Sequence, residues 1–419
     1  MSDHTSSVTQ GTAPKPLDGI RVVEFATLIA GPSAASMLAA LGADVIKVEP
    51  IAGDPARGLV ATAAPDRVAP AFVANNVGKR SVAIDLKSSQ GAQIGRRLIE
   101  SADVVIDNYR RGVMSRLGLD PDELVAQNNR LVWITIAGFG PEGSWADRPA
   151  VDQIVQAESG MIGTTGTQDV AGYKTGYPAV DHTAAHIVVQ AVLALLLNRH
   201  KTGQGRRHVV SLYGVALSIQ TTPMTDYLIA GTIPQRAGNA GPLSAPADSF
   251  RAADGEVMIV AYQEAHWQRL CRCLDITNLL DDPRFNTPLS RLRNRDELRV
   301  EIERSTANRK SDELAELLDS AGVMASRIRS YPEVVESEQT RMNKLVVDVI
   351  GGGGNHYRTI RQPNDVFGND TQRYLPTLGQ HTLAVLNELG FDAEEVDQLQ
   401  HAGVVGCKES SASAPPNGR

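Results

Sequence analysis

Short runs of β-branched residues alternate with helical patterns along the first third of the chain, and no other feature restricts the possible folds as strongly. Each run is four to six residues long and is followed by a segment with helical spacing of apolar residues. The predicted strands are residues 20–25, 44–49, 81–84, 104–106 and 131–136. Strands that alternate with helices are typical of βαβ units, which build a parallel sheet with helices on both faces. The sequence therefore predicts an α/β fold.

The amino-acid composition of the chain changes after residue 225. Residues 226–248 are rich in Gly, Pro and Ala, which indicates a crossing into a second lobe. Residues 249–260 predict a β-hairpin with Asp254-Gly255 at its turn. Arg-rich helical patterns then run from 264 to 320, with a strand expected at 323–328 and a second hairpin at 341–362. The two ends of the chain, residues 1–16 and 408–419, have the Ser-, Pro- and Gly-rich composition of loose tails.

Charge and composition exclude several classes of protein. The formal net charge is −7, which argues against a protein that coats nucleic acid. The longest apolar segment, Ile187 to Leu197, is interrupted by Gln190 and is about half of what a bilayer requires, so a helix buried in the protein is expected rather than a membrane span. Three cysteines cannot form a disulfide framework, and no secretory signal is visible, so a cytoplasmic location is expected.

Three short motifs have a functional and a plain interpretation, and the plain one is favoured for each. Gly138 to Gly143 matches G-x-G-x-x-G, but Pro141 removes an amide that a nicotinamide cofactor would need, so a turn is expected. His182 and His186 have metal-ligand spacing, but no third ligand is evident, so no metal site is expected. The four glycines at 351–354 resemble an anion cradle, but a hairpin tip fits them better.

Asp181 lies where the apolar helix begins. There its carboxylate would cap the first turn, and the helix dipole would lower its pKa and keep it ionised. An ionised carboxylate at the end of a buried helix is also able to act as a nucleophile. A basic cluster follows the third and fourth predicted strands, at the sheet edge where ligands bind, and suits a phosphorylated cofactor or a solvated basic face: Lys87, Arg110, Arg111 and Arg116.

Ordered motifs from about residue 16 to 406 resemble the family III CoA-transferases, also called the CaiB/BaiF family. The matching segments are Pro16 to Phe25, Ala30 to Pro32, Leu41 to Pro50, Gly53 to Arg57, Gly78 to Ser81, Ile84 to Lys87, Asn108 to Arg110, Arg116 to Gly118, Gly138 to Gly140, Gln156 to Gly166, Lys201 to Gly205, Leu378 to Thr382 and Leu389 to Phe391. Several motifs in this order are far more specific than any one of them.

The resemblance implies a fold and an assembly. Members of this family form an interlocked homodimer, in which two chains are threaded through each other. The implied large domain is Rossmann-like with a parallel sheet and is built from both ends of the chain, here residues 17–225 and 330–407. The implied smaller α+β domain comes from the middle, here residues 226–329.

The resemblance also implies chemistry. The family's nucleophilic aspartate corresponds to Asp181, which would attack an acyl-CoA thioester and pass CoA to a carboxylic acid through anhydride and aspartyl-CoA thioester intermediates. CoA and acyl-CoA are then substrates, and no permanently bound cofactor, metal, nucleic acid or membrane is implied. The implied CoA contacts are Ile29, Ala30, Ile84, Asp85, Leu86, Lys87, Asn108, Tyr109, Arg110 and Arg116.

Some positions depart from relatives in the same family. Ile29, Pro50 and a glycine loop shortened to residues 238–241 argue against formyl-CoA and oxalate as the substrate pair. The family also contains α-methylacyl-CoA racemases, which carry a His where this chain has Val151, next to Asp152. Because Val transfers no proton, a transferase is favoured over a racemase, although Glu264 matches a supporting Glu of racemases. A non-catalytic acyl-CoA binding protein and a nicotinamide oxidoreductase are two further interpretations of the chain.

Overall fold

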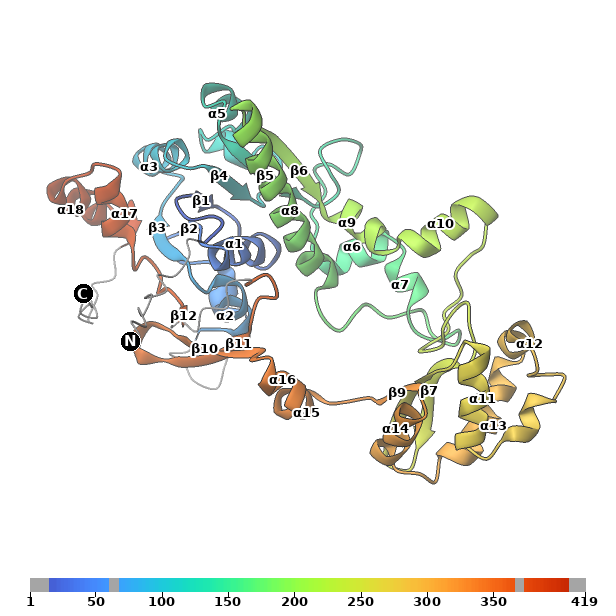
Figure 1. Cartoon of the computed structure of the whole chain (residues 1–419). Coiled ribbons are helices and arrows are strands. Elements are labelled where there is room, and N and C mark those ends of the chain that lie inside the picture. The colour runs from blue at the N-terminus through green and yellow to red at the C-terminus, as the bar shows by residue number, and fades with distance from the viewer. Residues whose placement is uncertain (1–14, 60–67, 366–372, 407–419) are drawn as a thin grey trace, which may run out of the picture. The chain divides into compact units, whose positions relative to one another are not determined.

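The chain divides into two compact units. The structure is a computed structural model that describes residues 15–59, 68–365 and 373–406. The large unit contains residues up to 158, 176–219 and those from 343 onward, so it is built from both ends of the chain (Figure 1). The second unit contains residues 159–175 and 220–342. Cys407 and most of the two predicted tails lie outside the described residues.

A seven-stranded sheet forms the centre of the large unit. Its order is β13-β3-β2-β1-β4-β5-β6, and all neighbours are parallel except β13, which runs antiparallel to β3. The strands are β1 (Arg21–Glu24), β2 (Asp44–Glu49), β3 (Arg80–Ile84), β4 (Val104–Asp107), β5 (Val132–Ala137), β6 (Arg207–Ser211) and β13 (Val405–Gly406). The first five confirm the predicted strands and the parallel α/β sheet. The order reverses at β1 and β4, and ligands bind in the crevice beyond such a reversal in open α/β sheets.

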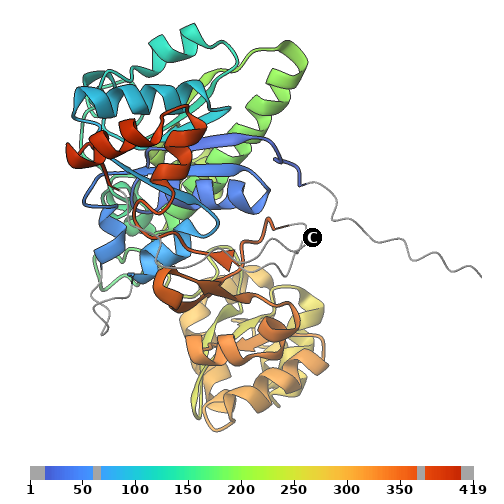
Figure 2. The same ribbon diagram turned by 90° about the vertical axis from the view of Figure 1, so that its left-hand side faces the viewer.

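Helices cover both faces of this sheet. On one face, α3 (Ser89–Glu100), α5 (Pro121–Gln127), α17 (Thr382–Glu388) and α18 (Ala393–His401) share one buried apolar cluster with the strands. Figures 1 and 2 show the last two of these helices, in red, beside the β3 edge. On the other face, α1 (Ala30–Ala40) packs against α8 (Ala179–Thr202). Because α1 consists mostly of Ala, Gly and Ser, these two helices approach each other closely.

Helix α8 is longer and less buried than its apolar sequence predicted. It runs for 24 residues and ends at Gly203, whose φ of 75° closes the helix. Its length and composition would suit a membrane span, but one face packs on α1, β5 and β6. Only 33% of its most apolar stretch is buried, and Leu193 and Leu197 are exposed. The prediction of a buried helix is therefore wrong for one of its faces, because composition does not reveal which face is covered.

The remaining elements of the large unit are short. They are the 3₁₀ turn Pro55–Gly58, α2 (Pro70–Asn76), α4 (Val113–Arg116), α6 (Asp152–Glu158), α9 (Leu212–Ile219), β10 (Val346–Ile350), the 3₁₀ turn Gly352–Gly354, β11 (His356–Ile360) and β12 (Arg373–Tyr374). Strands β10 and β11 pair antiparallel around the glycine turn, which confirms the predicted hairpin tip.

The second unit combines a small antiparallel sheet with helices. Strands β7 (Ala247–Ala252), β8 (Gly255–Val260) and β9 (Met324–Arg327) pair in that order, which confirms the predicted hairpin and the following strand. Its helical segments are α7 (Met161–Thr164), α10 (Thr221–Ala230), α11 (Glu264–Cys273), the 3₁₀ turn Thr277–Leu280, α12 (Pro288–Arg293), α13 (Arg295–Thr306), α14 (Ser311–Ser320), α15 (Tyr331–Glu336) and α16 (Glu338–Met342). Trp267 and Phe285 lie in its buried core.

A network of buried charges lies beneath the first loop of the large unit. Lys47 Nζ is 3.1 Å from Glu24 Oε1 and 2.8 Å from Asp54 Oδ2, and Lys79 Nζ is 2.7 Å from Glu24 Oε2. All four side chains are fully buried. The three acidic partners Glu24, Asp54 and Glu49 raise the pKa of Lys47 against the opposing effect of burial. The lysines also donate to the carbonyl oxygens of Ala26 and Pro32, so the network fixes the backbone as well as the charges.

Lys47→Met tests whether the fold depends on this network. The substitution leaves Asp54 and one oxygen of Glu24 buried without their cation, so we expect the free energy of unfolding to fall by about 3–5 kcal/mol. Lys310→Met is the control, because the exposed Lys310–Glu313 pair at 3.8 Å should contribute less than about 1 kcal/mol. Urea unfolding followed by circular dichroism measures both. Equal losses in the two variants would contradict a structural role for Lys47.

Candidate active site

A cavity of about 500 Å³ opens at the carboxyl-terminal edge of the sheet, within the large unit. Segments that follow β1, β4 and β5 contribute most of its lining, together with the first turn of α8. Six residues proposed from the sequence lie in this lining: Ile29, Ala30, Asn108, Tyr109, Arg110 and Asp181. The structure therefore brings residues from three distant parts of the sequence to one hollow.

The loop after β1 is held in a fixed shape. Thr27 N donates to Asn108 Oδ1 at 2.9 Å, and Asn108 Nδ2 donates back to Thr27 O at 2.8 Å. Leu28 has a φ of 68°, in the left-handed region that a Leu rarely adopts, and its amide donates to Asp54 Oδ1 of the buried network. These bonds place Ile29 and Ala30 at the start of α1, facing the cavity. Asn108 is thus a structural clamp between two loops.

The loop after β4 has its own buried anchor. Asp107 accepts from Trp133 Nε1 at 2.7 Å and from Thr135 Oγ1 at 2.8 Å, and it also accepts from the amide of Tyr109. Burial raises the pKa of Asp107, and these donors act in the opposite direction. The anchor fixes the start of the segment that carries Tyr109, Arg110 and Arg111 along the cavity wall.

Asp181 does not cap α8. The helix begins at Ala179, so Asp181 lies in its first turn. The capping carboxylate belongs to Asp152 of α6, whose Oδ2 accepts from Val180 N at 2.8 Å and from Asp181 N at 3.1 Å. The predicted capping role of Asp181 is therefore wrong, because a residue 29 positions earlier occupies the helix amides. Asp152 is buried, and its other oxygen accepts from Gln156 one turn further along α6.

The pKa of Asp181 is raised rather than lowered. Burial raises it from 3.8 to about 7, with the nearby Asp152 carboxylate as the second cause. The prediction of a lowered pKa is wrong, because desolvation and a like charge outweigh the helix dipole. In the part of the chain that the structure describes, the Asp181 side chain has no hydrogen bond or ion pair. A carboxylate in this state is a stronger base and nucleophile than an ordinary aspartate.

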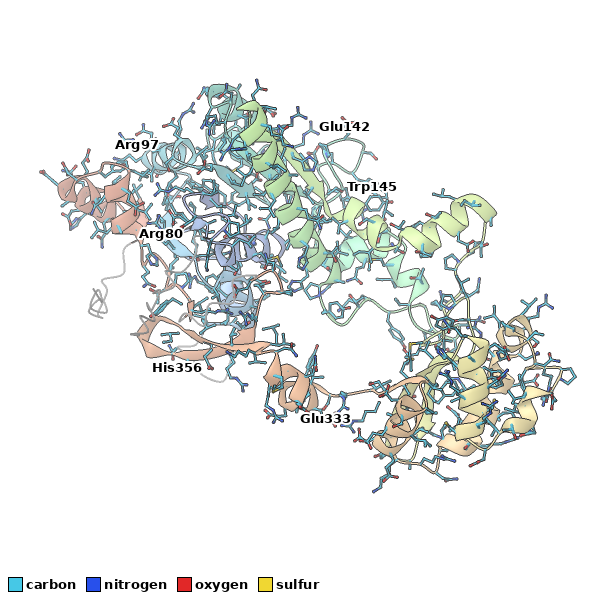
Figure 3. All side chains as sticks on the ribbon, in the orientation of Figure 1. Arg80, Arg97, Glu142, Trp145, Glu333 and His356 are labelled. Carbon is cyan, nitrogen blue, oxygen red and sulfur yellow. The ribbon has the colours of Figure 1, made fainter. Side chains whose placement is uncertain are left out.

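The segment between β5 and α6 forms another wall of the cavity. No helix begins at Gly138 to Gly143, so the predicted turn is confirmed and a dinucleotide motif is excluded. Trp145, labelled in Figure 3, contacts Phe139 and Tyr213 of α9 edge-on, with ring centroids 5.3 and 6.0 Å away. The guanidinium of Arg148 lies over Phe139 and Trp145. These contacts hold the wall that carries Val151, which is 52% exposed and lines the cavity.

Other predicted contacts lie outside this lining. Ile84 is buried at the end of β3, and Asp85, Leu86 and Lys87 form the turn that follows, where Asp85 accepts from the Lys87 amide. Arg116 ends α4. None of these five residues is among those that line the cavity with Asp181. Their role toward CoA stays a prediction.

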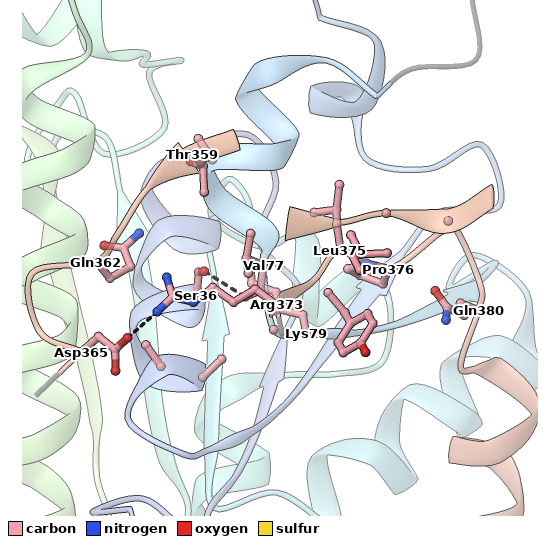
Figure 4. Close-up of a pocket in the computed structure, with 18 of the residues that line it drawn as sticks. Ser36, Val77, Lys79, Thr359, Gln362, Asp365, Arg373, Leu375, Pro376 and Gln380 are labelled. Atoms are coloured by element: carbon pink, nitrogen blue, oxygen red, sulfur yellow. Dashed lines mark hydrogen bonds and ion pairs between the residues drawn. The ribbon is translucent and has the colours of Figure 1, made fainter. Parts of the chain in front are cut away.

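Two further sequence motifs are the histidine pair on α8 and the glycine run 351–354. His182 and His186 are one turn apart on α8, and the described ranges hold no group of three or more His, Cys, Asp or Glu in metal-binding geometry. The glycine turn 351–354 borders a second cavity of about 710 Å³, shown in Figure 4 with the ion pair of Arg373 and Asp365 at 2.6 Å. This cavity contains neither Asp181 nor any predicted CoA contact.

The family model for CoA-transferase family III matches residues 17–382. The chain belongs to this family. It is 36% identical over 388 residues to "Probable fatty acyl-CoA transferase Rv3272" of Mycobacterium tuberculosis, covering 89% of this chain and 98% of that protein. It is 35% identical to the succinate–glutarate CoA-transferase of Agrobacterium fabrum, covering 89% and 96%. A crystal structure of a CaiB/BaiF family protein from Brucella suis superposes with a TM-score of 0.80 at 33% identity, covering 90% and 100%.

The expected family and enzyme class are thus confirmed, and the chain is a family III CoA-transferase. Glu264, the position shared with racemases, lies in the second unit and pairs with the buried Arg291 at 3.0 Å. Sequence reasoning missed two contributors to the site: Asp152 as the helix cap and Leu28 with its left-handed backbone. The spacing of Asp152 and Gln156 at i and i+4 on one helix was the available signal for the first.

Asp181→Asn should stabilise the protein in a pH-dependent way. A raised pKa means that the folded state binds the proton more tightly than the unfolded chain, so the wild type loses stability as pH rises from about 4 to about 7. The neutral variant avoids this loss. Three pKa units correspond to about 4 kcal/mol, so we expect it to exceed the wild type by about 4 kcal/mol at pH 8 and to match it at pH 4. Urea unfolding at both pH values measures the difference, and a gap independent of pH would show that the Asp181 pKa is not raised.

Proposed function

We propose that this family III CoA-transferase moves CoA from an acyl-CoA to a carboxylic acid, with Asp181 as the covalent nucleophile. The observation that carries the proposal is the Asp181 carboxylate, which lies in a cavity without a hydrogen-bond partner among the described residues and has a pKa of about 7. At neutral pH about half of the molecules therefore carry an ionised Asp181 that no donor holds back.

The proposed reaction consists of two exchanges. An Asp181 oxygen attacks the thioester carbon, the C–S bond breaks, and CoA leaves as the thiolate while a mixed anhydride forms. The thiolate attacks the aspartyl carbonyl of the anhydride, which releases the donor acid and leaves an aspartyl-CoA thioester. The acceptor carboxylate attacks this thioester, and the released thiolate then takes the acyl group of the new anhydride. Asp181 is regenerated, and CoA is bound to the acceptor.

The lining of the cavity supports a CoA ligand. Arg110 and Arg111 supply positive charge next to Tyr109, and Ile29 and Ala30 lie at the start of α1. Arginines suit the phosphates of CoA because their N–H donors fit phosphate oxygens in pairs. The sheet order 3-2-1-4-5-6 and the position of the cavity at its carboxyl edge support a Rossmann-like large domain.

The two similar proteins carry different acids in their names, fatty acyl in one and succinate and glutarate in the other. The apolar side chains of Ile29 and Val151 on the cavity wall favour a donor whose acyl group is not strongly charged near the thioester. A racemase is the second candidate, and Val151 counts against it because proton transfer on both faces of a substrate needs two acid–base groups.

Asp181→Ala should lower the rate of CoA transfer by at least about 10³-fold, because the covalent route is lost. Purified protein is incubated with a panel of acyl-CoAs and free acids in D₂O, and mass spectrometry detects new CoA esters and α-deuterium. New esters without deuterium support a transferase, whereas deuterium without an acceptor acid would establish a racemase. Asp397→Ala is the control, since Asp397 is 68% exposed on α18. Activity that survives in Asp181→Ala would contradict the nucleophile.

We also propose a homodimer with interlocked chains. Apolar residues of two helices are exposed in the described part of the chain: Leu193 and Leu197 on α8, and Leu228 and Ile229 on α10, which are 79% and 82% exposed. Helix α10 has no buried residue at all. Exposed apolar side chains in such numbers are typical of an interface.

Size-exclusion chromatography with light scattering tests the assembly. We expect twice the chain mass of 44.8 kDa, that is 89.6 kDa. Ile229→Asp should weaken the dimer, because it places a charge on the apolar face of α10. A mass of 44.8 kDa for the wild type at micromolar concentration would show that the chain is monomeric.

A further inference from the structure

Two carboxylates meet at the start of α8, and only one of them has hydrogen-bond donors. Asp152 Oδ2 accepts from the amides of Val180 and Asp181 at 2.8 and 3.1 Å, and Asp152 Oδ1 accepts from Gln156 Nε2. Asp152 is the acceptor in every one of these bonds. The Asp181 side chain, in contrast, has no hydrogen-bond or ion-pair partner in the described part of the chain.

This distribution is the reverse of what isolated helix chemistry favours. The amides of a first turn are the natural donors for a carboxylate in that turn, and they would stabilise the charged form of Asp181. Here the amides of Val180 and Asp181 donate instead to Asp152, which belongs to a different helix, α6. Asp152 and Gln156 are 5% and 1% exposed, so this arrangement is shielded from water.

We propose that Asp152 is a positioning residue that occupies the amides of α8 and thereby keeps the Asp181 carboxylate unbonded and reactive. The proposal rests on the nucleophilic role of Asp181 proposed above. The cap fixes the first turn, and with it the direction of the nucleophile. The negative charge of Asp152 also opposes ionisation of Asp181, so the electron pair of the carboxylate stays more basic than that of a capped aspartate.

Asp152 is the charged group that contributes to the raised pKa of Asp181. His182 is next to Asp181 and favours its neutral form, because burial lowers its pKa. The cavity also contains charged residues of both signs, which are Asp107, Arg110, Arg111, Asp120, Asp122, Asp147, Arg148 and Arg207. Burial is the first cause of the raised pKa of Asp181, and the Asp152 carboxylate is the second. Removing the charge of Asp152 should therefore reverse part of the shift.

Two substitutions separate charge from capping. Asp152→Asn keeps an oxygen that can accept from the amides of α8 but removes the charge. Asp152→Ala removes both. For Asp152→Asn we expect the midpoint of the acid limb of kcat/KM, near pH 7 in the wild type, to fall by roughly one unit. At pH 6 the ionised fraction of Asp181 then rises about fivefold, and kcat/KM relative to its own plateau rises with it.

The matched control is Asp392→Asn, the same chemical change at another helix cap. Asp392 Oδ1 accepts from Glu395 N at 2.8 Å at the start of α18, and Asp392 does not line the cavity. Its pH profile should coincide with that of the wild type. Asp152→Glu, which keeps the charge, should hold the midpoint near 7. Should Asp152→Asn not fold, Asp152→Ser carries the same test, because Ser also caps helices and has no charge.

The outcomes distinguish this inference from the proposed function. A lowered midpoint in the folded neutral variant, together with an inactive Asp181→Ala, supports the positioning role. An unchanged midpoint in the folded neutral variant, with Asp181→Ala inactive, overturns the role of Asp152 and leaves the nucleophile in place. Full transfer activity in Asp181→Ala overturns both. A loss of thermal stability in Asp152→Ala without any pH shift in the neutral variants shows a structural cap alone and overturns the inference.

Discussion

The buried ion network of Glu24, Lys47, Lys79 and Asp54 is the constraint on which the site depends. Its members come from β1, β2 and the segments that follow β2 and precede β3, so it links three neighbouring parts of the sheet. Through Ala26, Leu28 and Pro32 it also fixes the loop that carries Ile29 and Ala30 to the cavity. Burial lowers the pKa of Lys79 to about 8, which reflects the cost of this arrangement. The network thus holds one loop rigidly, and its acidic partners offset the cost of burying two lysines.

The surroundings of Asp181, the proposed nucleophile, show a similar balance between burial and hydrogen bonding. A carboxylate beside another carboxylate, half-buried at a helix start, is unfavourable for folding. The arrangement persists because Asp152 is itself satisfied by two amides and by Gln156. Hydrogen bonds therefore stabilise one acid and leave the other without donors. This asymmetry supports the nucleophilic role proposed for Asp181, since an aspartate with several donors is a weak nucleophile.

The sequence predicted the central sheet because its strands are short Val- and Ile-rich runs at regular spacing. Strand β6, which contains Arg207 and His208, and the two-residue β13 lacked that signal. The resemblance indicated Asp181 and the loops around it, since linear motifs carry this information. It did not reveal the direction of the Asp181 pKa, which depends first on burial and then on Asp152, a residue 29 positions away. The exposed face of α8 was missed for a similar reason: apolar composition does not say what covers a helix.

The pairing of β13 with β3 has a consequence for how this chain is made. Ile84 pairs with Val405, and 321 residues separate them. A ribosome that adds roughly 5 to 20 residues per second would need about 15 to 65 s between these two points. Throughout this interval the edge of β3 has unpaired amide and carbonyl groups, while the second unit is synthesised. A nascent chain with an open strand edge is a natural client for chaperones, and the last residues of the sheet act as the closing step of its biogenesis.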